Sequence, residues 1–263
     1  MSLIEEYNNV MNSLSIDFKN LYNNLTSLKT IDEIIINEPI ININCFLSMI
    51  SNIYHINKLT ILNNPNNQLM LLLDAFKNVD IDNLIIKNIK DIKDFNNIVW
   101  FLSKNTSIEY IDLSNNNLKD IDEFLISLTH NTSLKGLDLS NNNISNIRYM
   151  SDAFRFNSCI KHINLSNNQI EYIDSLCDLI GNNIIEELDV SNNIINDIYN
   201  VLDYYRKNTS LKKFNLDNNN LNDESLELLN DTDFLNKDDD YDDINEDENI
   251  DKIIEIRDFD IHK

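Results

Sequence analysis

A single short pattern recurs along the chain and constrains its fold more than any other feature. It reads Leu-x-x-Leu-x-Leu-x-x-Asn-x-Leu, with Ile, Val or Phe allowed for Leu. Regular copies occupy residues 108–118, 134–144, 160–170, 185–195 and 211–221. Less regular copies begin at residues 31, 56 and 81, so the eight starts are separated by 25, 25, 27, 26, 26, 25 and 26 residues. So regular a period indicates an array of stacked units that share one core.

The first part of each copy predicts a β-strand. Side chains alternate between the two faces of a strand. In the copy at 108–118, Ile111 and Leu113 are therefore expected in the core, while Tyr110, Asp112 and Ser114 point to the opposite surface. The strands of successive units are expected to be parallel, because a helix connects each strand to the next.

The second part of each copy predicts a helix. Apolar residues recur there at spacings of three and four, as at Ile121, Phe124, Leu125 and Leu128, which is typical of an amphipathic helix. The units restart at Asn-Thr-Ser or a similar sequence, and the asparagine there (Asn105, Asn131 or Asn208) is expected to take the left-handed conformation that usually requires glycine.

The strand pattern is the leucine-rich repeat motif, and residues 31–230 resemble the ribonuclease-inhibitor-like subfamily of these repeats. The resemblance implies an α/β leucine-rich-repeat solenoid, or horseshoe, with a parallel concave β-sheet, convex helices and about eight repeats. The units are slightly shorter than is usual in that subfamily, and its glycine after the strand is missing. A mixed or tightened helical turn is therefore expected on the convex side.

The asparagine of each motif is expected to be structural. A buried carboxamide at the turn that leaves each strand can bond backbone groups of adjacent coils, which would otherwise remain unpaired. These residues form a predicted ladder and are not candidates for ligand binding; they are Asn116, Asn142, Asn168, Asn193 and Asn219.

The ends of the chain differ from the repeats. Residues 1–30 predict an N-terminal helical cap over the first repeat, or else a separate docking motif. Residues 31–230 form the predicted solenoid. Residues 231–248 are strongly acidic and are expected to be disordered. Residues 249–263 are apolar again and predict a C-terminal cap or a short docking segment.

Charge and cysteine content restrict the partners and the compartment. With 21 Lys and Arg against 44 Asp and Glu, the formal charge is −23, which disfavours nucleic acid and anionic membranes and favours a basic protein partner. The N-terminus is acidic rather than basic, and no apolar run of about 18 residues exists. Three cysteines form no disulfide framework. These features predict a monomeric cytoplasmic protein, with a nuclear location as the alternative.

The strand residues whose side chains point away from the core are the candidate binding residues. Concave solenoid surfaces commonly bind partners, and aromatic residues often anchor an interface. Tyr110 and His162 flank Gly136, which predicts a shallow notch, and aspartates near the middle predict an acidic patch. The alternative is that Asp is simply a common solvent-exposed residue at this position of the motif and has no role in binding. The predicted protein-binding residues are Tyr110, Asp112, Asp138, His162, Asn164, Glu187, Asp189 and Lys213.

A second surface is expected on the convex side. Trp100 and Ile126 occupy equivalent positions in successive helices, and their later counterparts are aspartates. An exposed apolar pair is therefore expected there, either as a partner contact or as cover for an imperfect third repeat.

Catalytic and cofactor chemistry is not expected. Ser166, His162 and Asp138 share one face, but nothing in the sequence provides an oxyanion hole. The histidines and cysteines lack metal-ligand spacing, and two glycines cannot build a phosphate-binding loop. Asp238, Asp240 and Asp242 resemble the start of a calcium loop, but the required Gly and Glu are missing. No catalytic, cofactor or metal site is therefore predicted.

The sequence thus predicts a non-enzymatic scaffold that binds a protein partner through its concave face. One alternative is a regulator of an enzyme, such as a GTPase activator or a ubiquitin-ligase substrate receptor. Another is binding of basic proteins by the acidic segment. In layout alone the chain resembles the acidic leucine-rich nuclear phosphoproteins and the Ran GTPase-activating proteins. The acidic segment is short and no arginine marks a catalytic loop, so neither activity is inferred.

Overall fold

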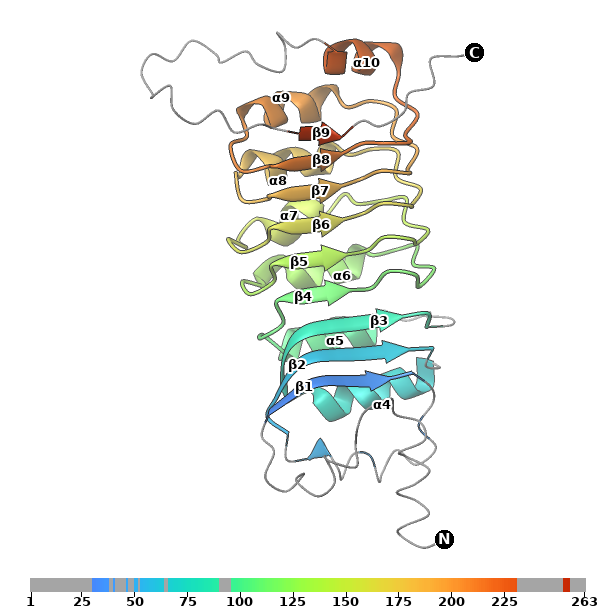
Figure 1. Ribbon diagram of the computed structural model, residues 1–263, viewed down its shortest axis with the longest axis vertical. Helices are drawn as coiled ribbons and strands as arrows, with labels where there is room; N and C mark the ends of the chain where they lie inside the picture. Colours follow the sequence, from blue (N-terminus) through green and yellow to red (C-terminus); the bar gives the residue numbers. More distant parts are fainter. Residues whose placement is uncertain are drawn as a thin grey trace, which may run out of the picture. The chain divides into compact units, whose positions relative to one another are not determined.

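Parallel strands alternate with helices along the chain, as the repeat pattern predicts (Figure 1). This computed structural model describes residues 30–37, 53–63, 66–89 and 96–230, the single residues 40, 46, 50 and 51, and the backbone of 253–255. The chain divides into unit 1, residues 1–117, and unit 2, residues 118–263. Apart from Thr30 and 253–255, the predicted cap at 1–30 and the segments 231–248 and 249–263 lie outside the described residues.

The described part of unit 1 contains four parallel strands and two helices. The strands are β1 (Thr30–Ile36), β2 (His55–Leu62), β3 (Asp80–Lys87) and β4 (Tyr110–Asp112), and the helices are α4 (Asn66–Phe76) and α5 (Asn96–Lys104). The strand register aligns four buried residues, one from each strand: Ile34, Leu59, Leu84 and Ile111. Runs of Ile favour extended backbone, because a β-branched side chain packs well on a pleated sheet. The first three strands accordingly reach seven or eight residues.

The strands of unit 2 are shorter and equally regular. They are β5 (Gly136–Asp138), β6 (His162–Asn164), β7 (Glu187–Asp189), β8 (Lys213–Asn215) and β9 (Ile253–Glu255), and each pairs in parallel with the next. Because β9 pairs with β8, the backbone at 253–255 occupies the edge of the sheet after the last repeat.

The helices of unit 2 lie on one side of its sheet (Figure 1). They are α6 (Asp122–Ser127), the 3₁₀ turn η1 (Leu128–His130), α7 (Met150–Phe154), the 3₁₀ turn η2 (Asp174–Leu176), α8 (Cys177–Gly181), α9 (Tyr199–Lys207) and α10 (Asp223–Asn230). The two 3₁₀ turns confirm the mixed, tightened helical side that the short repeat predicts. We call the opposite side of this sheet the open face.

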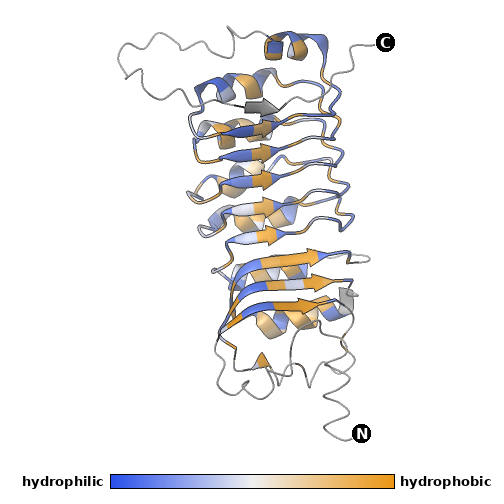
Figure 2. Cartoon of the chain, in the orientation of Figure 1, coloured by the Kyte–Doolittle hydropathy of each residue, from blue (hydrophilic) through white to orange (hydrophobic). Residues whose placement is uncertain are grey.

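The core of unit 2 lies between the sheet and the helices. The middle residue of each of the strands β5–β8 is buried and apolar (Leu137, Ile163, Leu188 and Phe214), which appears as apolar colouring within these four arrows (Figure 2). Tyr205 of α9 packs against Phe214 with ring centroids 5.8 Å apart. Burying one such large side chain contributes about 1.5–3 kcal/mol. The apolar side chains of the strand and of the helix in each repeat therefore both stabilise the stack.

The predicted asparagine ladder is confirmed in unit 2. Asn168 Oδ1 accepts the backbone N–H of Ile144 at 3.0 Å, and its Nδ2 donates to the carbonyls of Leu139 and Leu165, also at 3.0 Å. Ile144 and Leu139 belong to the preceding repeat, so each buried amide connects two coils. Asn142, Asn193 and Asn219 accept equivalent backbone bonds. Buried backbone groups need partners, and these side chains supply them.

The prediction of left-handed asparagines at the ends of the helices is wrong. Asn131 and Asn208 are extended, with φ values of −75° and −77°, and Asn105 is not among the residues with positive φ. Asn208 Oδ1 instead accepts the N–H groups of Ser210 and Leu211, so the side chain itself closes the turn. Two left-handed asparagines, Asn117 and Asn183, lie elsewhere, the second just after α8. The others follow the strands, with φ between 52° and 61°: Asn63, Asn88, Asn115, Asn141, Asn167, Asn192 and Asn218. Asparagine tolerates this conformation better than most residues, so it replaces the missing glycine there.

Candidate protein-binding face

The first residues of β5, β6, β7 and β8 form a row across the open face. The register aligns Gly136 with His162, His162 with Glu187, and Glu187 with Lys213. We call these four residues the strand-start row. Each precedes a buried residue of its strand, so the side chains of His162, Glu187 and Lys213 point away from the core. The sheet therefore presents His162, Glu187 and Lys213 as neighbours, as the sequence predicts.

Two side chains of the strand-start row, those of His162 and Glu187, are in contact across adjacent strands. His162 Nδ1 lies 3.4 Å from a carboxylate oxygen of Glu187, and their side chains are 43% and 57% exposed. Exposed pairs of this kind contribute roughly 0–1 kcal/mol to stability. These two side chains are therefore positioned by the sheet but are not required to hold it together.

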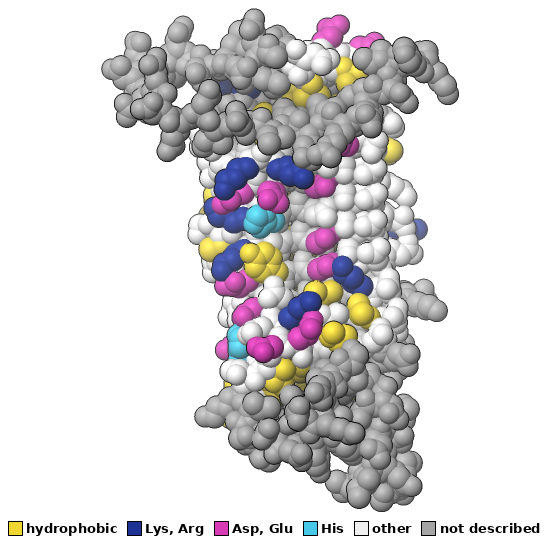
Figure 3. Space-filling model, viewed as in Figure 1, with side chains coloured by type: hydrophobic (Ala, Val, Ile, Leu, Met, Phe, Trp, Pro, Cys, Tyr) yellow, Lys and Arg dark blue, Asp and Glu magenta, His cyan; other side chains and the backbone are white. Residues whose placement is uncertain are grey.

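A second charged cluster is formed by the residues that immediately precede β6, β7 and β8. The carboxylate of Glu186 pairs with Lys161 Nζ at 2.8 Å and with Lys212 Nζ at 2.7 Å. Hydrogen bonds from these two ammonium groups lower the pKa of Glu186 to about 2. The sequence analysis missed this cluster, although the charges recur at the repeat spacing. Figure 3 shows basic and acidic side chains gathered along this edge of the strands.

The last residues of β5–β8 also stabilise the scaffold. Asp138 Oδ1 accepts the backbone N–H of Ser140 at 2.8 Å, and Asp189 Oδ1 accepts that of Ser191 at 2.9 Å. The side-chain amide of Asn164 donates to Asp138 Oδ2 at 3.2 Å. Asn215 bonds Asp189 in the same way, also at 3.2 Å.

These strand-end residues, Asp138, Asn164, Asp189 and Asn215, therefore close the loops and connect adjacent strands. Several acceptor positions of the two carboxylates are already occupied. The predicted acidic patch is present in sequence, yet its side chains are less available than those of the strand-start row.

Two predicted site residues lie in unit 1. Tyr110 is 40% exposed at the start of β4. Asp112 Oδ1 accepts the N–H of Ser114 at 3.0 Å, and its other oxygen pairs with Lys87 Nζ at 2.5 Å. The notch proposed between Tyr110 and His162 joins unit 1 to unit 2, so it stays a prediction.

The apparent Ser-His-Asp grouping is not assembled in unit 2. Ser166 Oγ donates to Asn164 Oδ1 at 2.8 Å, while His162 faces Glu187. Asp138 holds Ser140 and Asn164 instead of a histidine. A triad requires the nucleophile and base to share a hydrogen bond, and these three residues are engaged elsewhere.

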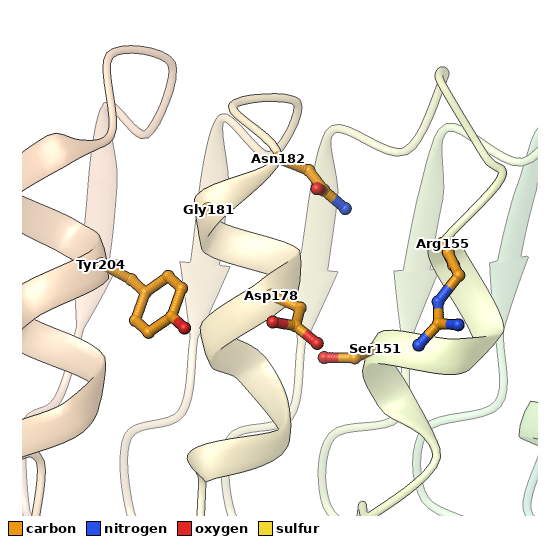
Figure 4. A pocket seen from close by; sticks show the side chains of 6 residues that line it. All are labelled: Ser151, Arg155, Asp178, Gly181, Asn182 and Tyr204. Atoms are coloured by element: carbon orange, nitrogen blue, oxygen red, sulfur yellow. The ribbon is translucent and has the colours of Figure 1, made fainter.

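The helix side of unit 2 carries a groove over α7, α8 and α9. Two adjoining hollows of about 280 and 510 Å³ occur there. Figure 4 shows Tyr204 beside α8, with Asp178, Ser151 and Arg155 along the groove. Arg155 pairs with Asp152 at 3.0 Å, so part of the lining is already neutralised. The mixed charge of this groove indicates no particular ligand.

The predicted apolar pair on the helix side is exposed at both positions. Trp100 is 41% and Ile126 52% exposed. Trp100 belongs to unit 1, where Lys77 Nζ lies 6.0 Å from its ring centroid. Ile126 belongs to unit 2, so contact between the two stays a prediction.

Two other kinds of site were sought among the described residues. No group of three or more His, Cys, Asp or Glu side chains in that part of the chain could hold a metal ion. Within the same ranges, no helix has both the length and the apolar character needed to cross a membrane.

Comparison with known proteins identifies the repeat. Residues 104–121, 130–147, 156–172 and 207–229 match the model of the Leucine Rich repeat family. These four segments are leucine-rich repeats. The chain's parallel strands and one-sided helices are those of an α/β leucine-rich-repeat solenoid, while the ribonuclease-inhibitor-like subfamily is not confirmed.

Solved leucine-rich-repeat structures are similar in fold. An internalin (inlF) from Listeria monocytogenes aligns with a TM-score of 0.52 and 21% identity, over 72% of this chain and 54% of its own. Internalin C2 (inlC2) from the same organism aligns with a TM-score of 0.50 and 19% identity, over 74% of each chain. This chain thus spans about half the length of the first internalin. No curated protein sequence matches it.

Proposed function

We propose that this leucine-rich-repeat chain is a non-enzymatic scaffold that binds a protein partner through the open face of β5–β8. The observation that carries the proposal is the strand-start row. His162, Glu187 and Lys213 are set side by side by the strand register, and the exposed His162–Glu187 pair contributes little to stability.

The physical advantage of such a face is its preorganisation. Adjacent strands are held about 4.8 Å apart by backbone hydrogen bonds, and the asparagine ladder fixes the turns that follow them. Side chains fixed in this way lose less conformational entropy when a partner binds. Repeat proteins commonly use extended surfaces of this kind for binding.

Charge on the open face supports a partner with both acidic and basic groups. Lysines lie at the starts of the strands, and Asp138, Asp189 and Asp217 lie at or just after their ends. We propose that basic groups of the partner face these aspartates, in keeping with the acidic composition of the chain.

The test uses two triple variants with equal net charge. The open-face variant is His162→Ala, Glu187→Ala and Lys213→Ala. The control on the helix side is Asp152→Ala, Arg155→Ala and Tyr199→Ala, which also removes one acid, one base and one ring from exposed positions. Each purified protein is used for affinity capture from an extract of cells that express the chain, and circular dichroism checks the fold.

The proposal predicts a set of captured proteins that is lost with the open-face variant and kept with the control. If the two variants capture the same proteins as wild type, the open face is not the binding surface. If only the helix-side variant loses the captured proteins, the binding site is the groove over α8 instead of the open face.

A further inference from the structure

Four lysines of unit 2 lie together at one edge of an otherwise acidic protein. Three of them immediately precede β5, β6 and β8, and the fourth begins β8; we call Lys135, Lys161, Lys212 and Lys213 the lysine edge. Glu186 and Glu187 lie at the corresponding positions of β7. Four lysines minus two glutamates give this edge a formal charge of +2, although the whole chain carries −23.

The glutamates do not neutralise this edge. Glu186 accepts contacts from both Lys161 and Lys212, and one carboxylate balances only one of two ammonium groups. Hydrogen bonds from both ammonium groups lower the pKa of Glu186 to about 2, so this carboxylate is ionised while it is shared between them. Lys212 is also 65% exposed while it makes this contact, so its ammonium group keeps access to solvent.

We propose that the lysine edge receives an acidic segment of the protein partner, lying across the starts of β5–β8. This inference rests on the proposed function of the open face and specifies the chemistry of one part of the partner. Carboxylates of the segment pair with the ammonium groups of the edge, and the glutamates of β7 are the groups with which they compete.

The spacing of the edge suits an extended segment. Successive strands are about 4.8 Å apart, so β5 to β8 span roughly 14 Å. Alternate residues of an extended chain lie on one side about 6.6 Å apart, so a segment of about five residues places three carboxylates along this span. The aspartates at the strand ends lie about 7–13 Å farther along each strand, and their repulsion keeps the segment at the strand starts.

The negative charge of the whole chain makes the test selective. A protein with a charge of −23 repels acidic peptides in general. At 0.15 M salt the Debye length is about 8 Å, so distant repulsion is screened and contact pairs at the edge remain. Binding of an acidic peptide under these conditions therefore requires a local basic site.

The experiment measures fluorescence anisotropy of a labelled decapeptide of alternating glutamate and alanine, with the full chain at pH 7. A glutamine–alanine peptide is the neutral probe. Lys161→Gln with Lys212→Gln removes the centre of the edge. The matched control, Lys119→Gln with Lys207→Gln, removes two lysines elsewhere in unit 2 and leaves the same net charge.

We expect the glutamate peptide to bind wild type and the glutamine peptide not to bind. The edge variant should weaken binding by about tenfold, the equivalent of about 1.4 kcal/mol, while the control stays within about twofold. Glu186→Gln should strengthen binding several-fold, because it removes the competing carboxylate. A merely structural role for Glu186 would not raise affinity.

Three results overturn the inference. They are no binding of the glutamate peptide to folded wild type, equal effects of the edge and control variants, and equally tight binding of a single-stranded DNA decamer at the same site. If the open-face triple variant still loses its captured proteins, the scaffold proposal stands and only the acidic-segment inference fails.

Discussion

The carboxamide oxygen of Asn168 accepts a 3.0 Å hydrogen bond from the backbone N–H of Ile144, one repeat earlier in the chain. The same side chain donates to the carbonyls of Leu139, Leu165 and Ser166. A single buried residue thus satisfies backbone groups of two coils. The leucine-rich-repeat stack depends on such side chains, because its strands are short and its loops are buried against each other.

Asn168→Ala should therefore lower the free energy of unfolding by about 2–5 kcal/mol, because several buried backbone groups lose their partner at once. Urea unfolding followed by circular dichroism measures the change. Asn182→Ala is the control, since Asn182 is exposed at the end of α8, and it should change stability by less than about 0.5 kcal/mol. Equal effects of the two substitutions would refute the ladder.

Asn167 provides a test of the left-handed turn after β6. Its φ is 56°, a region that costs most residues about 1–2 kcal/mol. Asn167→Ala should destabilise the protein by about 1 kcal/mol, and Asn167→Gly should be neutral or slightly stabilising. The same urea titration ranks the three proteins. The explanation fails if alanine is tolerated as well as glycine.

Glu186 predicts a pH dependence of stability. Lys161 and Lys212 lower its pKa to about 2, from an ordinary value of 4.5, so folding favours the ionised form. Its contribution is complete above about pH 4.5 and is lost as the pH falls toward 2. The stability difference between wild type and Glu186→Gln should therefore be constant above pH 4.5 and shrink below it, by about 1 kcal/mol for two exposed pairs.

Urea unfolding between pH 2 and 7 measures that difference. In a background of Lys161→Met and Lys212→Met, the same Glu186→Gln substitution should lose most of this pH dependence. A difference that is unchanged by removing both lysines would show that they do not cause it.

Gly181 and Tyr204 should be energetically coupled. A Cβ at Gly181 would lie 2.9 Å from Cδ1 of the Tyr204 ring, so the ring must move when alanine is introduced. Gly181→Ala alone should change stability little, because the helical preference for alanine is offset by displacement of the ring. In a Tyr204→Ala background the same substitution should stabilise by up to about 1 kcal/mol. A double-mutant cycle gives the coupling, and additive effects would contradict the close contact.

The residue pattern of the repeat predicted most of the fold. Leu137, Ile163 and Leu188 are buried at the expected strand positions, and the helices follow where the apolar spacing changes. Asparagine was correctly expected to form hydrogen bonds with neighbouring coils. The left-handed conformation, however, was expected for the asparagines that follow the helices, and most left-handed asparagines follow the strands instead. Both Asn131 and Asn167 are asparagines near the end of an element, and only backbone geometry distinguishes them.

For the candidate site, the sequence identified the face and the structure ranked its side chains. Strand alternation alone placed His162, Glu187 and Lys213 on one side of the sheet. Strand alternation also placed Asp138 and Asp189 among the candidate binding residues, although the side chains of these aspartates accept hydrogen bonds from the loops that follow their strands. Alternation specifies the direction of a side chain and carries no information about its hydrogen-bond partners.

The sequence by itself determined the repeat, the strand-and-helix order and the identity of the core, because hydrophobic periodicity is a local property of the chain. Only the tertiary structure decided which polar groups meet across repeats. Lys161, Glu186 and Lys212 are about 25 residues apart, yet stacking brings their charged atoms within 3 Å. Such contacts between residues of different repeats depend on strand register and side-chain conformation, and both are fixed only when the coils pack together.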